Sequence, residues 1–174
     1  PMLQYPIQTL CSIGAIDHVY VVIDARDQFW SQHDWPHYHG KLSVLRCGGA
    51  SRAQTVLNGL QAIASRVEDD TWVLVHDAAR PGLQAADVNK LINELQQDAV
   101  GGLLALPLPD TLKRGDDNQR TIETVPRENL WLAQTPQMFR YDLLKRALNA
   151  LPADTVTDEA QAIEAMGLKP KLVA

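Results

Sequence analysis

The sequence predicts a single α/β domain built on a mostly parallel, twisted sheet that is flanked by helices. Short apolar runs rich in β-branched residues alternate with segments whose apolar residues recur every three or four positions. This order implies crossover connections between parallel strands. The length of 174 residues suits one hydrophobic core, and 45% hydrophobic with 21% charged residues is ordinary for a globular protein. We find no internal repeat and no low-complexity tract.

The first half of the chain contains one complete βαβ unit. Its helix is entered through Gly48 and Gly49, directly after a strand. In chain order we expect a helix at 2–10, strands at 19–23 and 42–45, a helix at 56–64 and a strand at 72–75.

The second half continues the alternation after one interruption. Gly167 is placed as a C-cap glycine for the last helix. In chain order we expect a helix at 88–95, a buried strand at 101–106, helices at 143–148 and 160–166, and a strand that includes 171–174.

The interruption is the segment 107–127, which we predict to be a projecting hairpin or arm. Pro107, Pro109 and Gly115 punctuate it with turn chemistry, and Thr121 to Val125 alternates like an exposed strand. An arm that leaves a compact domain usually contacts something, so we expect this segment to touch another surface.

The stretch from Val73 to Pro81 is the most informative part of the sequence. An apolar strand runs into Asp77, then into the small residues Ala78 and Ala79, and then into Arg80. At the carboxyl end of a strand, Asp77 could hold a divalent cation and Arg80 could pair with phosphate. The sequence therefore indicates a polyphosphate site, with a strand-ending Asp that caps a turn beside Arg80 as the alternative.

Two further segments carry groups suited to a phosphorylated ligand. Gly48 and Gly49 open a helix, so their amides could receive an anion or a base edge, with the hydroxyl of Thr55 close by. The alternative is a glycine turn that Ser51 caps. The segment 109–114 brings a hydroxyl and two cations together, which would suit phosphate or else form a solvated turn.

Charge and cysteine content exclude several classes of protein. A net charge of -5 disfavours a general nucleic-acid binder, although a local basic pocket still permits a free nucleotide. No signal peptide and no apolar run of membrane length occur in the sequence, so no membrane partner is expected. Cys11 and Cys47 follow no metal or redox spacing, which favours a reducing cytoplasm.

One cluster of metal-ligand residues occurs in the sequence, and it matches no zinc pattern. It comprises His33, Asp34, His37 and His39, among aromatic residues. We expect a surface loop wrapped by aromatic side chains there. No Ser-His-Asp nucleophile pattern is found.

Taken together, these residues resemble the cytidylyltransferases of the non-mevalonate isoprenoid pathway, which join CTP to 2-C-methyl-D-erythritol 4-phosphate. Ordered matches run along nearly the whole chain. They are Gly48-Gly49-x-x-Arg52-x-x-Thr55-Val56-x-x-Gly59-Leu60, Val75-His76-Asp77-Ala78-Ala79-Arg80-Pro81, Asp110-Thr111-Leu112-Lys113, Val125-x-Arg127-x-x-Leu130-Trp131-x-x-Gln134-Thr135-Pro136-Gln137 and Thr157-Asp158-Glu159-Ala160.

The resemblance implies a Rossmann-like nucleotidyltransferase domain over 1–174 and a homodimer that exchanges the arm at 107–127. It further implies Mg²⁺-assisted attack of the substrate phosphate on the α-phosphorus of CTP, with pyrophosphate leaving. Such chemistry depends on positioning and charge neutralisation more than on a covalent nucleophile.

The resemblance also assigns roles to single residues. Asp77 would hold Mg²⁺ and nucleotide and, with Arg127, would act in catalysis. The nucleotide would be bound by Gly48, Gly49, Thr55, Asp77 and Ala78, with Gly49 and Thr55 at the cytosine and Ala78 at the ribose. The sugar-alcohol phosphate would be bound by Arg80, Thr111, Arg127, Thr135 and Thr157, of which Thr111 and Arg127 would come from the partner subunit.

The chain departs from the family pattern in several places. The family's amino-terminal Pro-Ala-Ala-Gly loop and its carboxyl-terminal Ile-Lys-Val-Thr segment have no counterpart in this sequence, so we expect efficient catalysis to need segments outside it. Ala50 stands where relatives often carry an acidic residue, and Thr55 where Ser is common. A pentitol-phosphate cytidylyltransferase and a nucleotide-binding scaffold without catalysis are the alternative functions.

Overall fold

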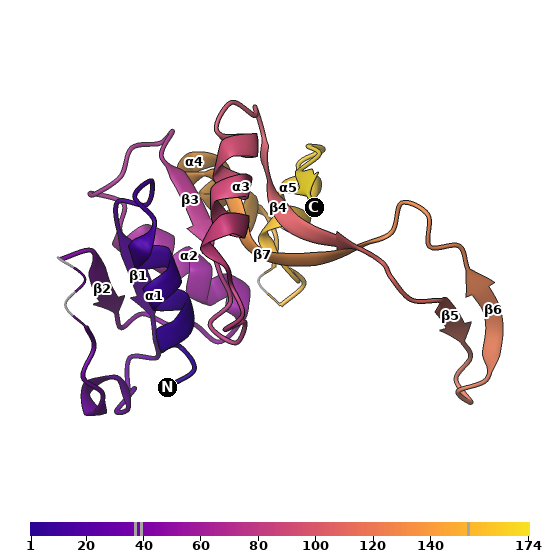
Figure 1. Cartoon of the computed structure of the whole chain (residues 1–174), viewed down its shortest axis with the longest axis horizontal. Helices are drawn as coiled ribbons and strands as arrows, with labels where there is room; N and C mark the ends of the chain where they lie inside the picture. Colours follow the sequence, from indigo (N-terminus) through magenta and orange to yellow (C-terminus); the bar gives the residue numbers. More distant parts are fainter. Residues whose placement is uncertain (37, 39, 153) are drawn as a thin grey trace.

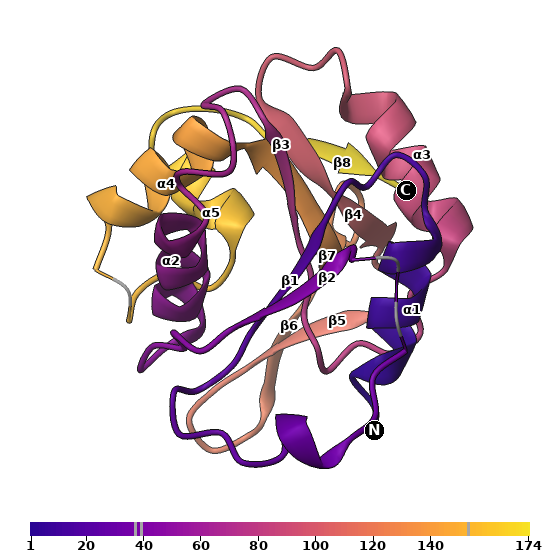
Figure 2. The ribbon, with the colours of Figure 1, turned by 90° about the vertical axis from the view of Figure 1, so that its left-hand side faces the viewer.

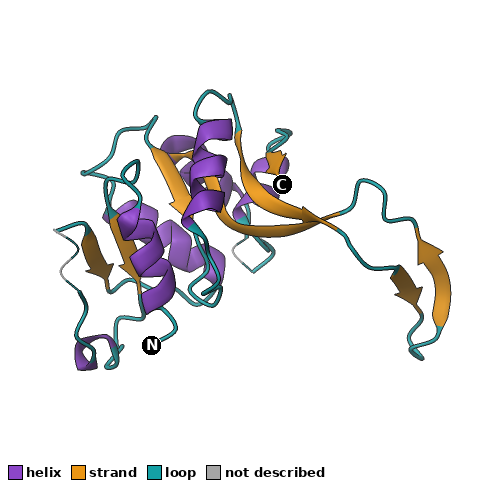
Figure 3. Cartoon of the chain, in the orientation of Figure 1, coloured by secondary structure: helices purple, strands orange, loops and turns teal. Residues whose placement is uncertain are grey.

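The structure is a computed structural model that describes residues 1–36, 38, 40–152 and 154–174. Its helices are α1 (Gln4–Ser12), α2 (Arg52–Ala62), α3 (Ala85–Leu95), α4 (Tyr141–Ala150) and α5 (Glu159–Glu164), with a 3-10 helix η1 at Trp30–Gln32. Its strands are β1 (Val19–Val22), β2 (Leu42–Leu45), β3 (Trp72–Val75), β4 (Gly101–Pro107), β5 (Leu112–Gly115), β6 (Thr121–Val125), β7 (Trp131–Arg140) and β8 (Lys171–Val173). The predicted α/β class is confirmed, and Figure 3 shows the mixture of helices and strands.

Helices cover both faces of the strands. In Figure 2, α2, α4 and α5 stand on one side of the strands, and α1 and α3 stand on the other. None of the helices in the described part of the chain is long and apolar enough to cross a membrane.

The two faces of the sheet bury separate groups of apolar side chains. Phe139 of β7 packs with α2, α4 and α5 in the larger group, whereas its neighbour Met138 packs with Leu91 and Leu95 of α3. Phe139 and Met138 are 0% and 1% exposed. Because successive side chains of a strand point to opposite faces, this one strand contributes to both halves of the core.

Strand β7 was not predicted from the sequence. It lies between β3 and β4 and runs antiparallel to both, while β8 pairs with β4 in parallel. β1 and β2 form a separate parallel pair. Gln134, Pro136 and Gln137 interrupt the apolar residues of β7, so its period-2 pattern is lost to a sequence reading.

Strand β4 approaches its neighbours closely. A Cβ atom on Gly101, whose φ is +105°, would lie 2.3 Å from the carbonyl oxygen of Met138. A Cβ atom on Gly102 would lie 2.0 Å from the carbonyl oxygen of Lys171. Only glycine permits these separations, so these two residues bring β7 and β8 together around β4.

Strands β5 and β6 form an antiparallel hairpin that extends away from the body (Figure 1). The predicted strand at 121–125 is confirmed as β6. Every residue of β5 is exposed, and only Val125 of β6 is partly covered. The hairpin therefore has no core of its own within one chain.

Helix α5 is shorter than predicted. It ends at Glu164 rather than near 166, and Gly167 lies in the following turn with φ of 79°. The prediction that Gly167 is the C-cap was therefore wrong, because Ala165 caps the helix.

Candidate functional site

Asp77 lies just beyond the carboxyl end of β3, between two arginine side chains. Arg52 Nε donates to Asp77 Oδ1 at 2.8 Å, and Arg80 Nε donates to Asp77 Oδ2 at 3.2 Å. The Asp77 side chain keeps 28% of its surface exposed. The contact with Arg80 agrees with part of the alternative interpretation, a surface ion pair. The contact with Arg52 brings the start of α2 to the same carboxylate.

The helix that follows the glycine turn thus reaches Asp77 through Arg52. Arg52 is the first residue of α2, directly after the glycine turn. Its guanidinium also reaches Glu159 of α5, with Nη1 to Oε1 at 2.7 Å and Nη2 to Oε2 at 2.9 Å. One arginine therefore joins two carboxylates that lie far apart in sequence.

No role was predicted from the sequence for Arg52 or Glu159. Both stood inside the family motifs, and the available signal was a glutamate among the apolar positions Ala160, Ala162 and Ile163 of a short helix. Glu159 is fully buried, with 0% exposure. A buried charge needs a partner, and Arg52 is that partner.

The shared guanidinium influences the protonation of both carboxylates. Burial would raise the pKa of Asp77, but hydrogen bonds and charge from Arg52 and then Arg80 outweigh it and lower that pKa. Burial raises the pKa of Glu159, and the Arg52 pair only partly offsets this. Burial disfavours the charged Arg52, yet its bonds to Glu159 and Asp77 raise its pKa. Asp77 is therefore held as an anion.

A chain of hydrogen bonds supports the backbone at Asp77. The carbonyl oxygen of Arg80 only accepts, so His76 Nε2, 3.1 Å away, carries the ring proton. His76 Nδ1 then accepts from Thr135 Oγ1 at 2.9 Å, and Thr135 Oγ1 accepts from Asp77 N at 3.2 Å. Burial lowers the pKa of His76, which favours this neutral ring.

The glycine turn before α2 is held by its own hydroxyls. Ser51 Oγ caps the helix by accepting from Gln54 N at 3.1 Å. Thr55 Oγ1 accepts from Gly49 N at 3.0 Å and donates to Ser51 O at 2.9 Å. A Cβ on Gly49 would lie 2.4 Å from Gln54 Cγ. The capped turn is therefore present, and the contact of Gly49 and Thr55 with cytosine stays a prediction.

The start of α5 is fastened to β7 beside this centre. Gln137, 1% exposed, donates from Nε2 to Asp158 Oδ2 at 3.0 Å and accepts Ala160 N on Oε1 at 2.8 Å. Thr157 Oγ1 donates to Gln161 Oε1 at 3.1 Å. Thr157 therefore lies two residues from the buried Glu159, on the same short segment as the Arg52 pair.

Two of the predicted substrate residues lie apart from Asp77 within this chain. Thr111 precedes β5, and Arg127 follows β6, where its Nη1 donates to the carbonyl oxygen of Pro109. Within the described residues, no hydrogen bond or ion pair links Thr111 or Arg127 to Asp77. Figure 1 shows the hairpin directed away from the body.

The donor set at Asp77 fits Mg²⁺. Proteins usually bind this ion through one or two carboxylates and leave its other positions to water and substrate phosphates. No group of three or more His, Cys, Asp or Glu residues that could hold a metal occurs among the described positions. A single, partly exposed carboxylate is compatible with a metal that would arrive bound to a nucleotide.

The predicted aromatic surface loop is present where the structure describes it. The rings of Trp30 and Trp35 stack with centroids 4.2 Å apart, and His33 lies edge-on to Trp35. His37 and His39 lie outside the described residues.

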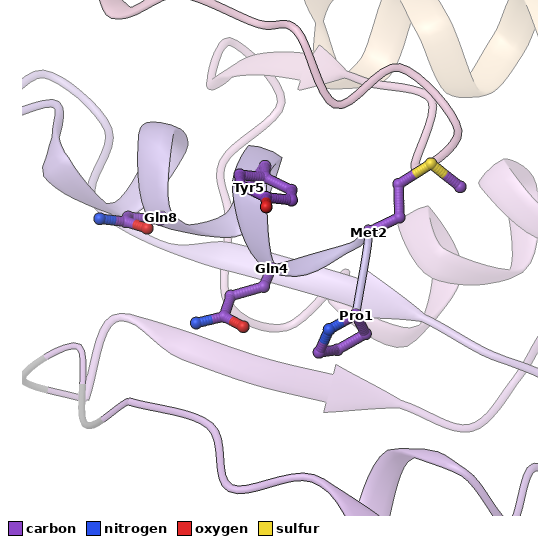
Figure 4. Close-up of a pocket in the computed structure, with 5 residues that line it drawn as sticks. All are labelled: Pro1, Met2, Gln4, Tyr5 and Gln8. Atoms are coloured by element: carbon purple, nitrogen blue, oxygen red, sulfur yellow. The ribbon is translucent and has the colours of Figure 1, made fainter.

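Two cavities lie away from Asp77. One of about 500 Å³ is formed at the base of the hairpin by residues that include Pro109, Arg127 and Trp131. Another of about 420 Å³ lies at the amino end of α1 (Figure 4), where its lining side chains are Pro1, Met2, Gln4, Tyr5 and Gln8. The first places Arg127 in a concave surface that a ligand or a second chain could enter.

Comparison with known proteins covers the whole chain. Residues 1–174 match the model of the family described as IspD, 2-C-methyl-D-erythritol 4-phosphate cytidylyltransferase. A protein of that name from Nitrosospira multiformis is 54% identical over 175 residues, which is 99% of this chain and 75% of the relative. The Nitrosomonas eutropha protein of that name is 53% identical with the same coverage.

Solved structures show the same relationship. A 4-diphosphocytidyl-2C-methyl-D-erythritol synthase is 35% identical, with a TM-score of 0.87 over 99% of this chain and 79% of that one. The 2-C-methyl-D-erythritol 4-phosphate cytidylyltransferase of Francisella tularensis is 32% identical, with a TM-score of 0.84 over 99% and 77%. The predicted Rossmann-like nucleotidyltransferase fold is confirmed.

Proposed function

Because the chain belongs to the 2-C-methyl-D-erythritol 4-phosphate cytidylyltransferase family, we propose that Asp77 is the centre at which it joins CTP to that phosphate. The observation that carries this assignment is the contact of Asp77 with Arg52, which brings the glycine turn and the end of β3 to one place. The enzyme is a nucleotidyltransferase of isoprenoid precursor synthesis.

In the reaction, an oxygen of the substrate phosphate forms a bond to the α-phosphorus of CTP. The bond between that phosphorus and the oxygen bridging to the β-phosphate breaks, and pyrophosphate leaves with the electron pair. Asp77 would bind Mg²⁺, which neutralises the triphosphate and the charge that develops on pyrophosphate. Arg80, whose side chain is 45% exposed, would turn from Asp77 towards a phosphate.

The nucleotide and the substrate would approach from different elements. The turn at Gly48 and Gly49 would receive the base, and Ala78 would allow the ribose close to the backbone. Thr157 would line the substrate side. Thr135 would act mainly through its hydrogen bonds to His76 and Asp77, because its hydroxyl is already engaged and the residue is only 7% exposed.

The hairpin supports the proposal of a homodimer. An isolated two-stranded hairpin is marginally stable, and this one exposes Leu112 by 40% and Ile122 by 62%. A second subunit would cover these side chains. It would also receive Thr111 and Arg127, which make no hydrogen bond or ion pair to Asp77 among the described residues of their own chain.

We place the protein in the cytoplasm. Cys11 and Cys47 are both free thiols, which suits a reducing compartment.

The substrate is tested by measuring pyrophosphate release from CTP by the full-length protein. We expect turnover with 2-C-methyl-D-erythritol 4-phosphate and Mg²⁺, and at least about tenfold less with a pentitol phosphate, because pocket contacts of this kind give that order of discrimination. Preference for the pentitol phosphate would favour the alternative enzyme. Tight CTP binding in a calorimeter without turnover of either substrate would favour a scaffold.

A further inference from the structure

The ion pair between Arg52 and Glu159 has no part in the chemistry described above. Glu159 is 0% exposed, and both of its oxygens accept from Arg52. A buried ion pair is expensive to desolvate and is often no more stabilising than apolar side chains of similar volume. Its stability contribution is therefore a weak explanation for its presence.

The geometry of the pair gives a better explanation. A guanidinium is planar, and two parallel bonds to one carboxylate fix its plane. With both Nη atoms of Arg52 on Glu159, the remaining Nε–H has one direction, and it meets Asp77 Oδ1 at 2.8 Å. Asp77 is thus oriented by a donor that a third residue holds.

Glu159 is itself rigidly placed. The residue before it, Asp158, caps α5 by accepting from Gln161 N at 2.9 Å. The residue after it, Ala160, donates its amide to the buried Gln137. The start of α5 is therefore fixed to β7 on both sides of Glu159, so this carboxylate has little freedom to follow movements of Arg52.

We propose that Glu159 and Arg52 are positioning residues that hold the Asp77 carboxylate in the orientation that receives Mg²⁺ with CTP. This inference rests on the proposed role of Asp77. Arg52 holds Oδ1 from the interior, whereas Oδ2 accepts from the more exposed Arg80, its one partner among the described residues. Oδ2 would therefore bind the metal once Arg80 turns towards a phosphate. The same bridge couples the segment that carries Thr157 to the metal side of the site.

The first test is the Glu159→Gln variant of the full-length protein. The amide keeps the volume but loses the charge and one accepting oxygen, so Arg52 is held at one point only. Mutation of a residue that orients a metal ligand typically lowers metal affinity or activity by about 10- to 100-fold. We expect the Mg²⁺ concentration for half-maximal turnover to rise by about that factor, with a smaller change in the KM for the substrate.

The matched control is Glu164→Gln, the same chemical change at an exposed position of α5. It should leave the Mg²⁺ requirement unchanged. An unchanged requirement in a folded Glu159→Gln variant would overturn the proposal.

A second variant separates positioning from folding. Replacing both residues, Arg52→Met with Glu159→Met, removes the pair without leaving a lone buried charge, so the variant should melt close to the unmodified protein. Calorimetric titration with CTP should then show that most of the gain in affinity from Mg²⁺ is lost. Full retention of that gain would overturn the proposal. Failure of this double variant to fold would also overturn it, because the pair would then serve the fold.

The variant Asp77→Asn separates the proposed metal role of Asp77 from the positioning role of Glu159 and Arg52. If it leaves the effect of Mg²⁺ on CTP binding intact, the proposed role of Asp77 fails, and the positioning role fails with it. If Asp77→Asn abolishes that effect but the variants of Glu159 and Arg52 preserve it, only the positioning role fails.

Discussion

At the scale of single residues, the site combines a carboxylate that stays charged with donors that hold it from several sides. Arg52 and Arg80 keep the pKa of Asp77 low although burial opposes them. Thr135 binds the backbone amide of the same residue. The side chain and the main chain of Asp77 are thus constrained independently, which favours a preorganised ligand for a metal–nucleotide complex.

The role of Asp77 predicts the effect of Asp77→Asn on catalysis. Loss of one charge-stabilising group at a reacting centre costs about 10²- to 10³-fold in kcat, and we expect that loss here. The KM for the substrate should change much less. Steady-state kinetics at saturating Mg²⁺ measure both, with circular dichroism to check folding. Activity within about threefold of the unmodified protein would contradict the metal role.

The hydrogen bonds of the Thr135 hydroxyl should contribute to the free energy of unfolding. Thr135→Val keeps the shape but removes the acceptor of Asp77 N–H and the donor to His76. An unsatisfied buried polar group costs about 1–3 kcal/mol, so the free energy of unfolding should fall by about that amount. Urea denaturation measures it, with Thr121→Val on the exposed β6 as the control. Equal losses in the two variants would show that the bonds of Thr135 contribute nothing specific.

At the scale of elements, β4 and β7 bring the site together. β7 presents Thr135 to Asp77 and Gln137 to α5, and it pairs with β3, the strand that leads to Asp77. β4 lies against both β7 and β8 through glycines that leave no room for a side chain. The position of α5 relative to Asp77 therefore depends on the close packing of this sheet.

The close approach at Gly102 gives the element-scale prediction. Gly102→Ala would place Cβ 2.0 Å from the carbonyl oxygen of Lys171, so β8 must move away from β4. Overpacking of this kind costs about 1–3 kcal/mol or more in the free energy of unfolding. Gly14→Ala, where a Cβ meets nothing within 4 Å, is the control. Chemical denaturation compares them, and equal stability of the two variants would contradict the packing argument.

At the scale of the whole molecule, the chain consists of a layered body and a hairpin that projects from it (Figure 1). The body carries Asp77, and the hairpin carries Thr111 and Arg127 at its base. Since a hairpin that exposes apolar side chains is incomplete alone, we expect the working unit to be two chains, each lending its arm to the other's site.

This arrangement predicts complementation between two inactive variants. Arg127→Ala should impair use of the sugar-alcohol phosphate more than CTP binding. Mixing it with an equal amount of Asp77→Asn and allowing subunits to exchange should restore up to about a quarter of the activity. About half of the dimers are then mixed, and one of the two sites in each mixed dimer is intact. The measurement is turnover before and after exchange. No restoration, in mixtures that form mixed dimers, would argue for a site built within one chain.

The local pattern of the sequence determined most of the elements and the position of the central carboxylate. Periods of two and of three to four residues are local signals, so β1, β2, β3, β4, α2, α3 and α4 were predicted near their observed places. The position of Asp77 just beyond the end of β3 followed from the same reasoning. The turn residues of 107–127 likewise predicted the hairpin. The direction of β7 and the burial of Glu159 were decided only by tertiary structure. Arg52 and Glu159 are 107 positions apart, and no periodicity reports which residues meet across that separation, because the contact exists only when the sheet has assembled.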